Sequence, residues 1–396
     1  MKWSNKGHQF DTLGKVFENR KIYLYGAGGD YSAPYLAYLE KCGLGEMVDG
    51  FIDHNYRNMP DGYLGKPVYS PDKLFLEHDR NHIIIVALRE PLKTQIMDRL
   101  VRAGYPENAE CFTWDRFVHN LNDIILPVYA MYAQERLILS SACIIPSTVC
   151  NLKCRDCLNF TPYIKQFEIR ELEEVCRDVD LLFTWVDYTF KFQISGGEPL
   201  LYKRFADLVE YIGVHYRNKI DVFETVLNGT VVPSDEVCTV MKKYQMTVVL
   251  DDYRANIASQ IDRRAEIIKQ IEKHDLLWVD NKVEEWFDLD ILHTDNSGQS
   301  EEDLAEYFDI CNNPWHCYEK GKMYACNFDR FASKAGLNED VPEASFDFRE
   351  MTKEKKKELL EFTLNYNEKG YVPLCKKCAG WADMNKNRVP VAVQVE

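Results

Sequence analysis

The feature that most constrains this 396-residue chain is a group of three closely spaced cysteines. Cys150, Cys154 and Cys157 follow the spacing C-x3-C-x2-C. Three thiolates at this spacing can bind three irons of a [4Fe–4S] cluster, whereas a structural cluster normally takes four cysteines. The loop therefore predicts a cluster whose fourth iron is left open for a substrate or a cofactor.

A second motif begins about forty residues downstream, where an apolar, strand-like stretch over 190–194 ends. The residues that follow it are Ser195, Gly196, Gly197, Glu198 and Pro199. Glycines allow the backbone to approach a ligand closely, and the carboxylate can hold a cationic amino group. Taken alone, the motif is also compatible with an ordinary turn at the end of a strand.

Together, and in this order, the two motifs resemble those of the radical S-adenosylmethionine (SAM) superfamily. The resemblance implies that SAM binds the open iron through its amino and carboxylate groups, and that the segment from Ser195 to Pro199 receives the amino group. Asp156 stands where the family more often has an aromatic residue, which leaves the cluster ligands intact. Asn228, after a further strand-like run, corresponds to a family segment near the SAM ribose, although Asn-Gly is also a common turn.

The resemblance implies an enzyme. An external electron donor of the flavodoxin or ferredoxin type would reduce the cluster, and SAM would then be cleaved to a 5′-deoxyadenosyl radical that abstracts hydrogen from the substrate. The protein would bind and orient the reactants and keep out water. Tyr163, Asp252 and Tyr253 are the candidate catalytic acid–base residues, because they lie close in sequence to the motifs.

Strand-like and helix-like segments alternate along the chain, which predicts an α/β protein with parallel sheets. We expect a Rossmann-like domain over 1–120 and a connecting helix over 121–140. The resemblance implies a partial (β/α)6 barrel over 141–305 and a small, cysteine-rich α+β extension over 306–396. In such a barrel the cofactor motifs lie at the C-terminal ends of the strands.

The N-terminal segment carries Gly26 and Gly28 between a predicted strand and a predicted helix, and Asp53 after the next strand. This arrangement is typical of a turn that binds phosphate at a helix N-terminus, with an acid for the ribose. Tyr31 replaces the third glycine of that fingerprint. The segment resembles Rossmann-like domains of sugar-nucleotide and capsule-biosynthesis proteins, which implies a nucleotide-type ligand; the alternative is a docking module without one.

Further cysteines follow in the last ninety residues. Cys311, Cys326, Cys375 and Cys378 have a spacing that resembles the Twitch region, a shortened relative of the SPASM extension, and this implies an auxiliary [4Fe–4S] cluster. Cys317 could replace Cys311 in that set. A zinc ion held by four cysteines is the alternative, because a C-x2-C half-site is common in zinc proteins.

Composition limits the partners and the compartment. A net charge of −15 disfavours nucleic-acid binding, which needs a basic surface. No apolar stretch reaches the roughly 18 residues of a membrane span, and no secretory signal is recognisable. We therefore expect a cytoplasmic protein whose 13 cysteines serve metal binding or catalysis rather than disulfides.

The substrate is the least constrained prediction. The resemblance of residues 1–120 favours a small-molecule or sugar-linked substrate: a sugar, an aminocyclitol or a nucleotide-linked sugar, changed by dehydrogenation, dehydration or epimerisation. A peptide or protein maturase is the alternative, and a non-catalytic metal-binding scaffold is a third. The acidic run over 275–309 is either a solvated face or a rim that attracts an amine-bearing or basic substrate.

Overall fold

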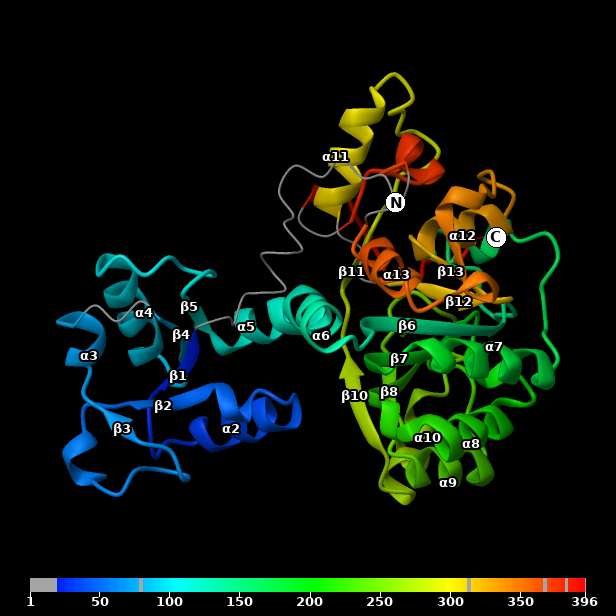
Figure 1. The fold of residues 1–396 in the computed structure, drawn as a ribbon. Coiled ribbons are helices and arrows are strands. Elements are labelled where there is room, and N and C mark those ends of the chain that lie inside the picture. Colours follow the sequence, from blue (N-terminus) through cyan, green and yellow to red (C-terminus); the bar gives the residue numbers. More distant parts are fainter. Residues whose placement is uncertain (1–19, 78–80, 312–314, 366–368, 382–383, 396) are drawn as a thin grey trace. The chain divides into compact units, whose positions relative to one another are not determined.

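The computed structural model describes residues 20–77, 81–311, 315–365, 369–381 and 384–395, and the chain divides into two compact units at Tyr129 (Figure 1). Each unit has its own sheet, and each is described by itself. The α/β class predicted from the alternation of segments is confirmed, since strands and helices alternate in both units.

The described part of the first unit is built on a five-stranded sheet with the order β3-β2-β1-β4-β5, in which all paired strands are parallel. The order reverses between β1 and β4, as in doubly wound folds. The central strands are continuous apolar runs with almost no exposed surface, as parallel strands covered on both faces require. The elements are β1 (Lys21–Tyr25), α2 (Ser32–Lys41), β2 (Val48–Ile52), β3 (Val68–Tyr69), α3 (Asp72–Phe75), β4 (His82–Val86), α4 (Leu92–Arg102), β5 (Cys111–Thr113) and α5 (Trp114–Asn120).

The second unit contains five parallel strands that follow one another in chain order, each pair joined by a helix. Buried residues of the first of these helices recur at helical spacing, at Val175, Val179, Leu182 and Phe183, so one face packs on the sheet. Figure 1 shows the four helices grouped beside the strands. The elements are β6 (Ile138–Ser147), α7 (Leu172–Trp185), β7 (Tyr188–Gly196), α8 (Phe205–Tyr216), β8 (Ile220–Leu227), α9 (Asp235–Lys243), β9 (Thr247–Asp251), α10 (Arg264–Lys273) and β10 (Leu277–Asn281).

The C-terminal part of the chain continues the same sheet on the other side of β6. Strand β12 pairs with β6 in parallel, and β13 and β14 follow in antiparallel pairing. Strand β12 thus adds a sixth parallel strand to the described part of this sheet, next to β6. The remaining elements are β11 (Glu285–Phe287), α11 (Glu301–Cys311), β12 (Cys317–Glu319), β13 (Lys322–Tyr324), α12 (Asn327–Lys334), β14 (Ser345–Asp347), α13 (Lys355–Thr363) and β15 (Arg388–Pro390).

The connecting helix is shorter than the apolar pattern over 121–140 predicts. A π-helical turn over Leu121–Ile125 leads into α6 (Leu126–Gln134), and Glu135 then adopts a left-handed conformation. The apolar residues that follow belong to β6, where Ile138 pairs with Tyr188 and Leu139 with Thr189. Apolar residues suit a helix and a buried strand equally well, so periodicity alone does not locate this boundary.

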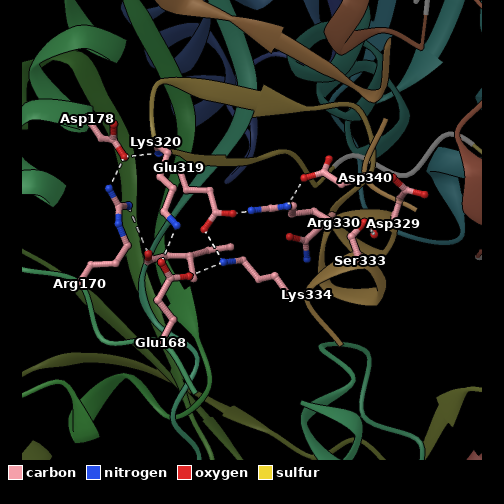
Figure 2. A network of polar contacts seen from close by, with 12 residues as sticks. Glu168, Arg170, Asp178, Glu319, Lys320, Asp329, Arg330, Ser333, Lys334 and Asp340 are labelled. Atoms are coloured by element: carbon pink, nitrogen blue, oxygen red, sulfur yellow. Dashed lines mark hydrogen bonds and ion pairs between the residues drawn. The ribbon is translucent and has the colours of Figure 1, made fainter. Parts of the chain in front are cut away.

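A buried network of charged side chains joins the β12–β13 hairpin and α12 to the barrel strands and α7 (Figure 2). Arg170 and Asp178 form an ion pair at 2.6 Å, and Asp178 also accepts hydrogen bonds from the backbone N–H groups of Lys320 and Gly321. Glu319, whose side chain has no exposed surface, pairs with Arg330 and Lys334. Buried charges are tolerated only when they are paired in this way.

Among the residues that the structure describes, none of the helices has both the length and the apolar character that a membrane span requires.

Removing the positive partner of the buried Asp178 should destabilise the protein. Arg170→Met keeps much of the side-chain volume but leaves a buried carboxylate, so we expect the free energy of unfolding to fall by on the order of 3 kcal/mol. Arg204→Met is the matched control, because Arg204 pairs with Asp207 where both side chains are about half exposed, and such pairs contribute about 1 kcal/mol or less. If urea denaturation shows the same loss of unfolding free energy in both variants, the Arg170–Asp178 pair does not have this stabilising role.

Candidate active site

The C-terminal ends of β6, β7, β8 and β9 meet at one cavity of about 300 Å³. The cysteine loop follows β6, the Gly-Gly-Glu segment follows β7, and further lining residues come from the ends of β8 and β9. Segments that are separated in the sequence are thus brought together at the strand ends, where barrel enzymes carry their chemistry. The predicted site residues in the lining are Cys150, Cys154, Cys157, Ser195, Gly196, Gly197, Glu198, Pro199, Asn228 and Tyr253.

The two glycines allow the end of β7 to lie directly against the backbone that leads into the cysteine loop. A Cβ atom on Gly196 would lie 2.0 Å from the carbonyl oxygen of Ser147, and one on Gly197 would lie 2.1 Å from that of Val149. The backbone N–H of Gly197 donates to Ser147 O at 3.1 Å, and that of Glu198 donates to Val149 O at 2.8 Å. The close approach that requires glycine is therefore an approach to the protein's own chain.

Glu198 is fixed in the cavity wall by backbone donors. Its carboxylate oxygens accept hydrogen bonds from Leu200 N at 3.2 Å and from Asn228 N at 2.9 Å, and the residue is only 2% exposed. Burial raises the pKa of Glu198 to about 7 and the nearby Asp251 adds to this, while the two N–H donors act in the opposite direction. A cationic group that enters the cavity would stabilise the ionised carboxylate.

The surroundings of two thiols of the cysteine loop favour the protonated form. Burial raises the pKa of Cys150 to about 11 and that of Cys154 to about 12. Iron cations would reverse this preference, because metal binding requires and stabilises the thiolate. Amide groups already point at two of the sulfurs: Asn228 Nδ2 lies 3.7 Å from Cys150 Sγ, and Gln394 Nε2 lies 3.2 Å from Cys154 Sγ.

In the part of the chain that the structure describes, no group of three or more His, Cys, Asp or Glu side chains is arranged to hold a single metal ion. A [4Fe–4S] cluster makes a different demand, because its thiolates bind separate irons and stand further apart than the ligands of one ion. The donor set of three thiols around one cavity fits such a cluster.

Tyr253 is the predicted acid–base candidate that lines this cavity. Its hydroxyl donates to a carboxylate oxygen of Asp251, which also accepts a hydrogen bond from Asn281 Nδ2 at 2.5 Å. Burial raises the pKa of both residues of this pair, and the charge of Asp251 raises that of Tyr253 further. Asp251, which sequence reasoning did not select, is therefore the acid that faces the site.

The other two acid–base candidates lie outside the lining of this cavity. Asp252 makes two hydrogen bonds with the Arg254 guanidinium, at 2.6 and 2.8 Å, and this pairing holds the pKa of its carboxyl down to about 2. Successive residues along a strand point to opposite faces, which explains why Asp251 and not its neighbour faces the cavity. Tyr163 lines a separate cavity of about 90 Å³ next to residues 288–293.

Part of the cavity wall comes from the C-terminal half of the chain and was not foreseen from the sequence. It is mainly aromatic and consists of Trp286, Trp315, Asn327, Phe328 and Trp381. Gln193 of β7 also lines the cavity. No local motif marks them, because they come from several segments that only the fold brings together.

The later cysteines separate into a set of four and one that lies elsewhere. Burial raises the thiol pKa of Cys326, Cys375 and Cys378, and the charge of Cys311 is close enough to raise all three further. Asn296 Nδ2 donates hydrogen bonds to the carbonyl oxygens of Cys375 and Cys378. The Tyr307 hydroxyl also donates to the carbonyl oxygen of Cys378. Cys317 instead lies on β12 opposite Cys143 of β6.

The glycine turn of the first unit is occupied by the protein's own groups. Asp53 accepts hydrogen bonds from Ala27 N at 2.9 Å and from Asn55 N at 2.7 Å. Gly26 has φ +117°, and a Cβ there would lie 2.8 Å from Ala87 O. Backbone conformation and packing therefore both require a glycine at this position. Gly28 also has a positive φ, of +73°. A nucleotide-type ligand at Gly26, Gly28 and Asp53 stays a prediction.

The chain matches no family model and no curated protein. Solved structures with some likeness include anSMEcpe with bound AdoMet (13% identity, TM-score 0.40, 58% of this chain and 83% of that one) and BtrN in complex with AdoMet and 2-DOIA (14%, 0.43, 64% and 98%). Streptococcus suis SuiB bound to S-adenosylmethionine is a third (16%, 0.29, 51% and 42%). The likeness is weak at these scores, so the assignment of the site depends on the residues that line the cavity.

Adding one methyl group at Gly197 should disrupt the contact between β7 and the cysteine loop. In Gly197→Ala the new Cβ meets backbone that cannot rotate away, so we expect the free energy of unfolding to fall by about 3 kcal/mol. Gly298→Ala is the control, because a Cβ at Gly298 meets no atom within 4 Å. Thermal and urea unfolding of the two variants measure the difference, and equal stability would show that this contact is not required.

Proposed function

We propose that this chain is a radical SAM enzyme, with a [4Fe–4S] cluster on Cys150, Cys154 and Cys157 and SAM bound beside it. The observation that supports this most directly is the convergence of the cysteine loop, the Gly-Gly-Glu segment and Asn228 on one cavity. When bound, the cluster and SAM supply one-electron cleavage of SAM and hence hydrogen abstraction from the substrate.

The residues of the cavity have distinct tasks in this proposal. Glu198 receives the amino group of SAM, and because burial raises its pKa to about 7, SAM should bind more tightly as the carboxyl ionises above that pH. Asn228 stands between Cys150 and Asn151, where it can orient both the loop and the cofactor. Tyr253, hydrogen-bonded to Asp251, would hold its proton and donate a hydrogen bond beside the substrate. An external flavodoxin- or ferredoxin-type donor supplies the electrons.

The aromatic part of the cavity supports a sugar, aminocyclitol or nucleotide-linked sugar as the substrate. The apolar faces of such rings pack on Trp286, Trp315 and Trp381, while Gln193 and Asn327 can bind hydroxyl or amino groups. This pattern of apolar walls with a few polar groups is typical of small-molecule sites. A peptide substrate is the alternative, since the acidic run over 275–309 suits a basic peptide as well as it suits an aminosugar.

Cys311, Cys326, Cys375 and Cys378 are proposed to hold an auxiliary [4Fe–4S] cluster, with Cys317 left out because of its place on β12. The burial of Cys326, Cys375 and Cys378, with the Asn296 and Tyr307 side chains fixing the loop carbonyls, suits a site that is closed to solvent. A zinc ion on the same four cysteines is the alternative.

Cysteine variants test both sites together. The reconstituted wild type should carry about eight irons, and Cys154→Ala and Cys378→Ala about four each. When the proteins are reduced in the presence of SAM, the wild type should form 5′-deoxyadenosine. Cys154→Ala should form at least 100-fold less, and Cys378→Ala should form clearly more than Cys154→Ala. Cys42→Ala, in the first unit, is the control.

The assays are anaerobic metal analysis and chromatography of the products. If the wild type contains zinc and Cys378→Ala does not, the four later cysteines would be assigned to a zinc site instead of an auxiliary cluster. If the wild type binds iron but forms no 5′-deoxyadenosine, whether candidate substrates are present or absent, the chain would be assigned as a non-catalytic metal-binding scaffold.

A substrate panel separates the two candidate classes. We expect 5′-deoxyadenosine formation to rise about tenfold or more with an aminosugar, an aminocyclitol or a nucleotide sugar, and not with basic peptides. Trp381→Ala should raise the KM for the active compound about tenfold through lost ring contact, while Trp185→Ala, at the end of α7 and outside the cavity lining, should not. Stimulation by peptides alone would make the maturase the better assignment.

A further inference from the structure

The last described residues of the chain cover the cysteine loop. Strand β15 pairs with β11, and the chain then continues over the loop that contains Cys154. Val391 and Ala392 are buried there at 3% and 0% exposure, in a cluster with Leu152 and Cys154. The side-chain amide of Asn256 donates to Val391 O at 2.8 Å and ties this segment to the loop after β9.

Backbone hydrogen bonds fix the register between this segment and the loop. Arg155 N donates to Val393 O at 2.7 Å, and Val395 N donates to Lys153 O at 2.9 Å. These two bonds flank an antiparallel bridge between Cys154 and Gln394. The side chain of Gln394 is therefore held beside the middle cysteine of the three.

Both ends of the Gln394 amide are used, and this defines its orientation. Its oxygen Oε1 accepts a hydrogen bond from Lys153 N at 2.8 Å. Its nitrogen Nε2 donates to Cys154 Sγ at 3.2 Å and to Ala392 O at 2.7 Å. The reversed orientation would place an N–H group against the Lys153 N–H, so the sulfur faces a donor.

We propose that Gln394 is a positioning residue that holds the cysteine loop and raises the reduction potential of the cluster through its N–H···S hydrogen bond. A donor to a ligand sulfur stabilises the added negative charge of the reduced state. This inference rests on the proposed function, because it concerns the cluster on Cys150, Cys154 and Cys157. It assigns to the end of the chain a role that none of the motifs indicates.

Two variants separate the two ends of the amide. Gln394→Glu keeps an acceptor for Lys153 N but replaces the donor to the sulfur by an anionic oxygen. Gln394→Met keeps the volume and removes both groups. Gln245→Glu adds the same charge at an exposed position after α9 and is the control.

The measurement is a redox titration followed by electron paramagnetic resonance, on the cluster signal that SAM perturbs. At a fixed applied potential we expect the ratio of reduced to oxidised cluster to fall about tenfold in Gln394→Glu, which is a shift of about 59 mV for a one-electron couple. Gln394→Met should shift in the same direction by less, and Gln245→Glu should match the wild type.

The outcomes distinguish this inference from the proposed function. A wild-type protein that takes up no iron overturns both. A wild type with a SAM-sensitive cluster whose potential is unchanged in Gln394→Glu overturns the role of Gln394 and leaves the proposed function in place. If Gln394→Glu does not assemble the cluster, the reduction potential of the cluster in Gln394→Met is measured instead, and an unchanged potential there overturns the role of Gln394.

Discussion

The arrangement of the site depends on the backbone contact between the end of β7 and the end of β6. Two hydrogen bonds, from Gly197 N and Glu198 N, join these strand ends across a distance that admits no Cβ atom. The contact fixes the start of the cysteine loop and, in the same step, aims the Glu198 carboxyl toward the backbone N–H of Asn228. Three motifs from three strands are thus positioned by one steric constraint.

The C-terminal part of the chain completes the barrel unit. Its strand β12 extends the sheet beside β6, and the paired charges around Glu319 and Asp178 hold the hairpin and α12 in place (Figure 2). From this base the same region supplies aromatic walls to the cavity and the segment that lies on the cysteine loop. Because buried ion pairs add directional constraints rather than much stability, they suit a surface that must be placed accurately.

Local patterns predicted much of this architecture, and long-range packing accounts for the rest. The predicted alternation of strands and helices is present, because helices such as α8 have an amphipathic period that is visible in the sequence. The motifs also predicted which residues gather at the strand ends. Choosing Asp251 over Asp252 required the phase of β9, and finding Trp315, Trp381 or Gln394 required contacts across more than a hundred residues, which periodicity does not contain.

The charges of the cavity indicate what kind of ligand it suits. Glu198 and Asp251 are both buried acids, burial raises the pKa of each, and Asp251 raises that of Glu198 further. Two acids that disfavour each other's ionisation gain most from a ligand that brings positive charge, because it lowers both pKa values at once. SAM carries such charge on its amino group and on its sulfonium. In the proposed function, the two buried acids would therefore favour a cationic cofactor over a neutral one.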